Sequence, residues 1–184
     1  MSGVKMISVR ADETGEEIAF ALARSSLGSV LVARRRGGDS RGVCAILLGD
    51  GPQQVIRELE AQFTGAVLTE GDPALEQPIS AASEAVERPW RPLDLPLDIR
   101  GTDFQKKVWD ALRKIPPGTT TSYAQVAQTI GAPKALRAVA GACAANRLAI
   151  AIPCHRVLRS NGSLSGYRWG MERKRQLLER EKNF

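Results

Sequence analysis

The chain has 184 residues, of which 43% are hydrophobic and 25% charged, a composition typical of a globular protein that can bury a core. It has no apolar stretch long enough to span a bilayer, and residues 1–10 are too polar for a signal peptide, so we expect a cytoplasmic protein. The three cysteines are far apart and the chain has one histidine, which argues against a disulfide framework and against a metal site.

The net charge of +6 is unevenly distributed along the chain. Residues 1–92 carry ten Lys and Arg against thirteen Asp and Glu, whereas residues 93–184 carry sixteen against seven. Only the second half therefore has the excess of positive charge expected of a protein that binds a polyanion. A solvated basic surface without a partner is the alternative.

The first half is predicted to be a small α+β domain. Apolar segments over residues 18–23, 29–33 and 43–49 alternate with turns and predict three strands in a meander. Helical spacing of apolar residues predicts a helix over 52–63, and a weaker helix is expected over 74–86. Three prolines in residues 87–101 predict an irregular linker. We therefore expect domains at 1–92 and 93–184.

The second half is predicted to be mainly helical. Thr102 with Gln105, and Ser122 with Gln125, have the spacing of capping boxes and predict two helix starts. The first helix should end at the two prolines 116 and 117, and the second should run through Ile130. A further helix rich in Ala and Gly is expected from about residue 133 to 146.

The two shorter helices, joined by a turn at Gly131, suggest a helix-turn-helix, although a plain helical hairpin would show the same pattern. Arg137 lies near the start of the second of these helices among small residues, and its long side chain is a candidate for reaching DNA. An apolar stretch over 148–153 is predicted to be a buried strand that ends at Cys154, and residues 171–184 are predicted to form a basic final helix.

Cys154 is the candidate nucleophile. Cys44 and Cys143 lie in apolar segments and are expected to be inert buried residues. Cys154 precedes His155, the sole histidine, and Arg156, so we expect a partly exposed thiol that can ionise. An imidazole acts best as a base when a carboxylate holds its other nitrogen, and the last helix offers three candidates, Glu172, Glu179 and Glu181.

Four motifs carry a resemblance to a known family: PCHRV, IPPGTTTSYAQVA, KALRAVAGACAAN and LSGYRWGMERKRQLL. With them, the last ninety or so residues resemble the O6-alkylguanine-DNA alkyltransferases, most closely the carboxy-terminal repair domain of bacterial Ada proteins. The resemblance is loose in the first half. It implies a ribonuclease H-like amino-terminal domain and a carboxy-terminal domain with a winged or helix-turn-helix DNA-binding motif.

The resemblance also implies a function. Cys154 would accept an alkyl group such as methyl from O6 of guanine and from O4 of thymine in double-stranded DNA. Because the thioether formed is not cleaved, the protein would act once. It would work as a monomer, without cofactor or metal. DNA would be bound through the minor groove, and the base would be flipped into the site.

The resemblance assigns roles to further residues. His155 would be the water-mediated base, oriented by Glu181, and Asn146 would fix the turn that carries the cysteine. Tyr123 would donate to guanine N3, and Arg137 would fill the gap in the base stack. The DNA backbone would be contacted by Ser160, and the pocket for the flipped base would be lined by Val157, Tyr167 and Arg168.

Two other classes of function remain as alternatives. A protein that binds alkylated DNA without chemistry would lack the acceptor cysteine, so Cys154 argues against it. A Cys-His hydrolase would need an oxyanion hole, for which the sequence offers nothing beyond the adjacent Cys154 and His155.

Overall fold

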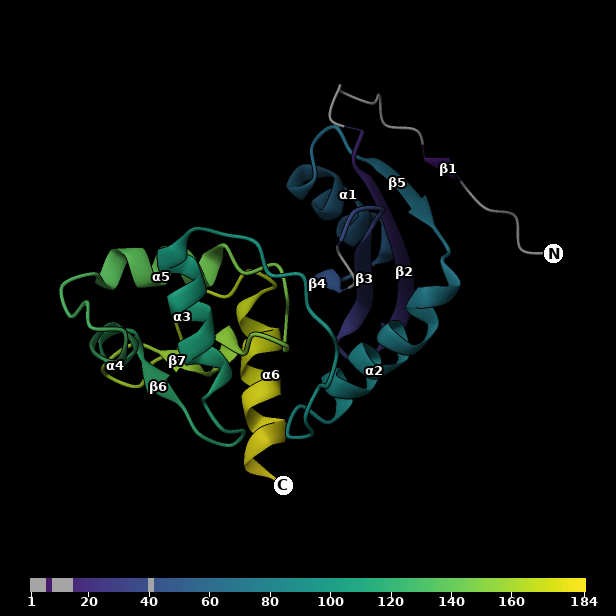
Figure 1. Ribbon diagram of the computed structural model, residues 1–184. Coiled ribbons are helices and arrows are strands. Elements are labelled where there is room, and N and C mark those ends of the chain that lie inside the picture. The colour runs from purple at the N-terminus through teal and green to yellow at the C-terminus, as the bar shows by residue number, and fades with distance from the viewer. Residues whose placement is uncertain (1–5, 8–14, 40–41) are drawn as a thin grey trace. The chain divides into compact units, whose positions relative to one another are not determined.

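The computed structural model describes residues 6–7, 15–39 and 42–184, which fall into two compact units (Figure 1). The first unit comprises Met1–Val86 with Leu93–Asp98, and the second comprises Glu87–Pro92 with Ile99–Phe184. The chain therefore passes between the units more than once within the proline-rich segment. None of the helices in the described ranges is long and apolar enough to cross a membrane.

The first unit is built on a five-stranded sheet with strand order β1-β5-β2-β3-β4. The strands are β1 (Met6–Ile7), β2 (Glu17–Ser25), β3 (Gly28–Arg36), β4 (Val43–Gly49) and β5 (Val67–Glu70). The predicted meander is confirmed, because β2 pairs antiparallel with β3, and β3 with β4. Every residue of β4 is buried, and α1 (Pro52–Gln62) packs on this strand.

Strand β5 is not in the predicted set. It pairs in parallel with β2, with Ile18 opposite Leu68. Its four residues, VLTE, are too few to carry an alternating pattern, so only pairing with a distant strand identifies them. The predicted helices are confirmed as α1 (Pro52–Gln62), which packs on β3 and β4, and α2 (Glu76–Glu87), which follows a short 3-10 turn, η1 (Pro73–Leu75).

The second unit is mainly helical, which confirms the α+β class. Its elements are α3 (Asp103–Arg113), β6 (Thr121–Ser122), α4 (Tyr123–Thr129), α5 (Leu136–Ala144), the 3-10 turn η2 (Cys154–Arg156), β7 (Val157–Leu158) and α6 (Met171–Lys182). Both predicted capping boxes form, at Thr102 before α3 and at Ser122 before α4. Strands β6 and β7 pair in parallel and hold the start of α4 beside the end of η2.

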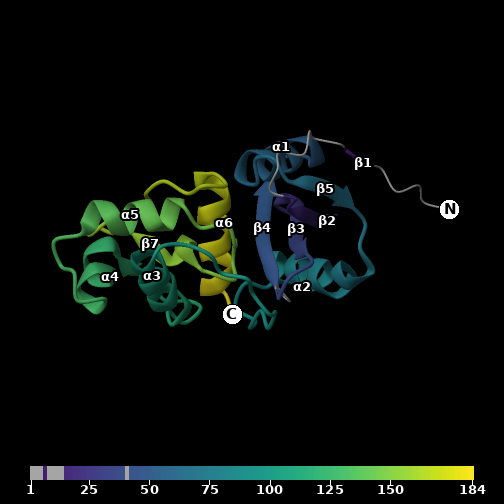
Figure 2. The same ribbon diagram turned by 45° about the horizontal axis from the view of Figure 1, so that its top comes forward.

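Helices α4 and α5 pack together as the predicted helix-turn-helix pair (Figure 1 and Figure 2). Gly131 has a φ of +74°, a conformation that favours glycine, and ends α4. Helix α5 begins at Leu136 and not near residue 133, because residues 132–135 form turns closed by hydrogen bonds from Ala132 N to Ala127 O and from Ala135 N to Ala132 O. The indole of Trp109 donates to Ala142 O at 2.8 Å and ties α3 to α5.

The predicted strand over residues 148–153 is wrong. The segment is buried but forms consecutive turns, in which Ile152 N donates to Leu148 O at 3.0 Å and Cys154 N to Ile152 O at 2.8 Å. Ile150 has a φ of +69°, which is strained for a β-branched residue. A continuous apolar run predicts burial, and in this segment the local hydrogen bonds produce turns and not an extended strand.

Candidate active site

Cys154 begins η2 and lies on the wall of a pocket of about 520 Å³. The expectation of a partly exposed thiol is wrong, since the residue is only 6% exposed. The pocket is lined by residues of α4, α5 and the loop before α6: Tyr123, Ala140, Cys143, Ala144, Cys154, Arg159, Ser165, Gly166, Tyr167 and Arg168. A small molecule or a single base that enters this pocket would therefore meet the sulfur directly.

Asn146 holds both the thiol and the turn that carries it. The fully buried side-chain amide donates to Cys154 Sγ at 3.2 Å and to Ile152 O at 2.9 Å, and its oxygen accepts from Leu148 N at 2.8 Å. These contacts close the turn that contains the strained Ile150. The turn therefore presents the sulfur in a defined position.

The Cys154 thiol is protonated at rest. Burial raises the pKa of Cys154, while the hydrogen bond from Asn146 and the nearby positive charge of Lys174 oppose the rise. Arg156 is not among these influences, so its expected role in ionising the thiol is not supported. Because the thiolate is the nucleophile, the site needs a base.

His155, the next residue in the chain, is fully buried and is the candidate for such a base. Its Nε2 lies 2.8 Å from Glu181 Oε1, and since a carboxylate only accepts hydrogen bonds, Nε2 carries the proton. The other nitrogen, Nδ1, is buried and has no hydrogen-bond partner among the described residues. Its lone pair is therefore available to accept a proton. Glu181 is thus the acidic residue of the last helix that contacts His155.

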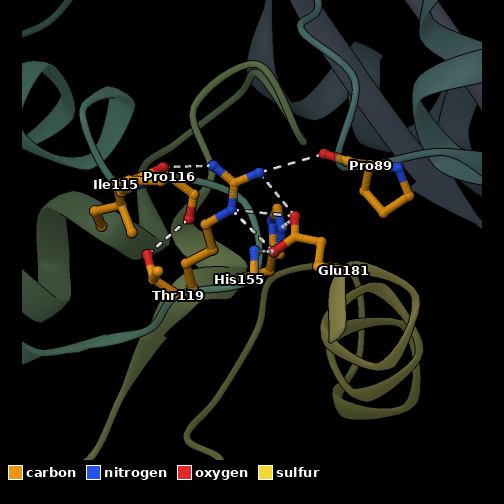
Figure 3. Close-up of polar contacts among 8 residues, drawn as sticks. Pro89, Ile115, Pro116, Thr119, His155 and Glu181 are labelled. Carbon is orange, nitrogen blue, oxygen red and sulfur yellow. Dashed lines mark hydrogen bonds and ion pairs between the residues drawn. The ribbon is translucent and has the colours of Figure 1, made fainter. Parts of the chain in front are cut away.

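Glu181, shown beside His155 in Figure 3, has Arg156 as its second partner. Its Nε lies 3.1 Å from both carboxylate oxygens, and one terminal nitrogen, Nη2, lies 2.7 Å from Oε1. The guanidinium also donates to Ile115 O at 2.7 Å and to Pro89 O at 3.3 Å. The hydrogen bonds from His155 and Arg156 lower the pKa of Glu181 against the opposing effect of burial, so the carboxylate is ionised.

Burial lowers the pKa of His155, although Glu181 opposes this effect. The imidazole is therefore neutral in the folded protein at pH values where an unfolded histidine, with a pKa near 6.5, begins to take up a proton. Below this pH the unfolded chain binds more protons than the folded chain, so stability falls with falling pH.

We therefore expect the free energy of unfolding, measured with urea, to fall between pH 7 and pH 5.5 at up to about 1.4 kcal/mol per pH unit. His155 is the only histidine, so the variant His155→Gln should lack this fall. An equal fall in the variant, or none in the wild type, would contradict the assignment of the buried neutral imidazole.

Tyr123, at the start of α4, lies on the pocket wall with its hydroxyl 2.6 Å from Ser165 Oγ. Two of the three residues predicted for the pocket, Tyr167 and Arg168, line it, and Arg168 donates to Ala144 O at the end of α5 at 2.9 Å. Val157 is fully buried and is not among the lining residues.

Arg137 and Ser160 lie outside the pocket lining, and both are exposed. Arg137 is on the exposed face of α5, whose other members are Leu136, Ala138, Ala140, Gly141 and Ala144. Except for Leu136 and Arg137 this face consists of small residues, and a Cβ added at Gly141 would meet no atom within 4 Å. The face therefore permits close approach of another surface. Arg137 has the longest side chain on this face.

Several polar residues of the site were not predicted. Arg159 lines the pocket from an exposed position, and Ser165 and Lys174 are buried beside it. Cys143 was expected to be inert, and burial raises its pKa to about 12, but it also lines the pocket. Within the described part of the chain, no group of three or more His, Cys, Asp or Glu could hold a metal ion.

The fold and site define a protein that presents a buried cysteine thiol, followed in the chain by a histidine bonded to a glutamate, to a pocket beside a helix-turn-helix. Residues 103–183 match the family model described as the 6-O-methylguanine DNA methyltransferase DNA-binding domain. The chain belongs to the family of O6-methylguanine-DNA methyltransferases.

Sequence and structure relatives support this membership. The chain is 54% identical over 169 residues to the bifunctional transcriptional activator/DNA repair enzyme Ada of Escherichia coli, over 91% of this chain and 47% of Ada. It is 44% identical over 121 residues to the inducible methylated-DNA–protein-cysteine methyltransferase of Bacillus subtilis, over 66% of this chain and 68% of that protein. It thus spans about half the length of Ada.

Solved structures give the same result over most of the chain. The O6-methylguanine methyltransferase of Mycobacterium tuberculosis is 35% identical, with a TM-score of 0.72, over 90% of this chain and 93% of that chain. The structure of the M. tuberculosis protein in complex with DNA matches with a TM-score of 0.69 at the same identity and coverage.

Proposed function

We propose that this protein repairs alkylated DNA by moving an alkyl group from O6 of guanine to Cys154, once and irreversibly. The observation that carries the proposal is the thiol itself, which is held by Asn146 on the wall of a pocket and lies next to a histidine that burial keeps neutral and Glu181 orients. The DNA complex of the M. tuberculosis relative supports DNA as the partner.

DNA binding is assigned to the exposed face of α5. Its small residues suit close approach to a minor groove, and the net positive charge of the second half suits the phosphates. An O6 atom inside a duplex is out of reach of a buried thiol, so the nucleotide has to leave the stack and enter the pocket. Arg137 fills the gap that the base leaves, and Ser160 contacts the DNA backbone.

Inside the pocket the flipped guanine lies against Tyr167 and Arg168, near Cys154. Val157, which lies behind this surface, supports the pocket from the core. His155 Nδ1 takes the thiol proton through one water molecule, and Glu181 stabilises the imidazolium that forms. The proton that the thiol loses thus stays within the site, on an imidazolium whose positive charge is balanced by Glu181.

In the transfer step the Cys154 sulfur bonds to the alkyl carbon as the bond from carbon to O6 breaks. The electron pair of that bond goes to the guanine, and Tyr123 gives a proton to N3, so the base leaves neutral. The product is a thioether, and the site has no group that could remove its alkyl. The protein therefore acts once.

The proposal includes three further points. The protein works as a monomer and without a cofactor, and O4-alkylthymine is its second substrate. Because the reaction requires a reduced thiol, it takes place in the cytoplasm.

The test is incubation of the protein with duplex DNA containing one O6-methylguanine, followed by peptide mass mapping. One methyl group per protein is expected on Cys154, none in Cys154→Ser, and an unchanged amount in Cys44→Ala, whose substituted residue lies in the first unit. A methyl group on Cys143, which shares the pocket, would overturn the choice of acceptor. Binding of the DNA without methylation would favour the non-catalytic alternative.

A further inference from the structure

Lys174, in α6, has a fully buried side chain that the proposed reaction does not use. Its Nζ lies 2.7 Å from Val157 O, 3.1 Å from Ser165 Oγ and 3.4 Å from Ser165 O. Lysine is among the residues least often fully buried, because removal of the ammonium from water is costly. A role beyond packing is therefore worth seeking in the groups it contacts.

The hydrogen bond between Lys174 and Ser165 Oγ has one direction, whereas either hydroxyl can be the donor between Ser165 and Tyr123. An ammonium has three protons and no lone pair, so Nζ donates to Ser165 Oγ. The Ser165 hydroxyl then has its own proton left to donate, and Tyr123 Oη lies 2.6 Å away. With Ser165 as donor to Tyr123, the phenolic proton of Tyr123 is free to point elsewhere. Tyr123 lines the pocket, so the open direction is toward the bound base.

We propose that Lys174 is a positioning residue that acts through Ser165 on Tyr123, directing the phenolic proton toward the base and stabilising the phenolic oxygen as the proton leaves. The proposal rests on the proposed alkyl transfer. In that step the Tyr123 O–H bond breaks and the proton bonds to guanine N3. The negative charge that began on the Cys154 thiolate ends on the Tyr123 oxygen.

Such support is needed at Tyr123. Burial raises the pKa of Tyr123 and makes the phenol a weaker acid, whereas the hydrogen bond with Ser165 lowers it. Hydrogen bonds to charged groups are about twice as strong as neutral ones, so the Ser165 hydroxyl, polarised by Lys174, binds the phenolate more tightly than the phenol. The contacts therefore favour the state in which the proton has been given away.

The test compares single-turnover methyl transfer from two duplexes. One contains O6-methylguanine, and the other contains its 3-deaza analogue, in which a C–H group replaces the N3 acceptor. With the normal base, Ser165→Ala and Lys174→Met should each slow transfer about tenfold, the loss of one charge-assisted hydrogen bond. With the 3-deaza base, each variant should transfer methyl at the same rate as the wild-type protein does from that base. Arg175→Met, an exposed neighbour on α6, should behave as wild type on both.

A double variant separates action through Tyr123 from a merely structural role. Ser165→Ala combined with Tyr123→Phe should be no slower than Tyr123→Phe alone, because both changes remove the same pathway. If Lys174→Met does not fold, the Ser165 series carries the test, with Ser165→Thr, which keeps the hydroxyl, expected to restore most of the rate.

Three results would overturn the inference while leaving the proposed function intact: a wild-type rate in Ser165→Ala, equal slowing on both duplexes, or effects that multiply in the double variant. Equal slowing by Lys174→Met would mean that its charge acts on the Cys154 thiol instead. Absence of methyl on wild-type Cys154 would overturn the proposed function and the inference with it.

Discussion

Replacement of Glu181 by glutamine is expected to slow alkyl transfer about a hundredfold or more and to destabilise the fold by about 3–5 kcal/mol. Glu181 is 2% exposed and accepts hydrogen bonds from His155 and Arg156. A neutral amide keeps the shape but leaves the buried guanidinium without its counter-charge, and it can no longer stabilise an imidazolium. Both losses come from one carboxylate.

The measurements are single-turnover methyl transfer and the free energy of unfolding in urea. Glu179→Gln is the matched control, because Glu179 precedes Glu181 on the same helix and is exposed. The control should match wild type in both measurements. A Glu181→Gln variant that transfers methyl at the wild-type rate would remove the carboxylate from the mechanism, whatever its stability.

Replacement of Arg137 by alanine is expected to slow repair of O6-methylguanine in duplex DNA by about 10- to 100-fold. Extrusion of a base costs a few kcal/mol, and a side chain that fills the gap offsets part of that cost. Free O6-methylguanine base needs no extrusion, so its reaction with Cys154 should be unaffected. The measurement is methyl transfer from both substrates, at saturating protein for the duplex.

A phosphate contact is the competing role for Arg137, and the same variants distinguish it. Lysine keeps the charge but loses the planar guanidinium, so Arg137→Lys should remain slow if the residue enters the base stack. If Arg137 only binds phosphate, the alanine variant would bind duplex more weakly with a smaller salt dependence, and at saturation it would transfer methyl at the wild-type rate.

The local elements of the fold follow from short-range sequence patterns. Each capping box, such as Thr102 with Gln105, is closed by two residues three apart in the chain, so its hydrogen bonds depend only on local sequence. The meander follows from apolar runs separated by turns. The parallel strand β5 and the turns over residues 148–153 could not be predicted, because their conformations depend on distant strands and on the side chain of Asn146.

The last helix carried a signal that sequence reasoning missed. Its buried residues, Lys174, Leu177, Leu178 and Glu181, follow the i, i+3, i+4, i+7 spacing of a single helix face. A charged residue at each end of an apolar stripe is a sign of buried charge, and such charges need partners. The pattern could have marked Lys174 as buried, but it could not have named Ser165 as its partner.

By itself the sequence indicated Cys154 as the candidate nucleophile and carried the family motifs, since Cys154, His155 and the flanking residues lie together in the chain and their chemistry depends on residue type. The tertiary structure decided what each group does there. It buried the thiol, so that the cysteine needs a base. It also placed Arg156 on Glu181 and Lys174 on Ser165. These contacts join residues 25 and 9 positions apart, between elements whose packing short-range patterns do not determine, and low-dielectric burial sets their strength.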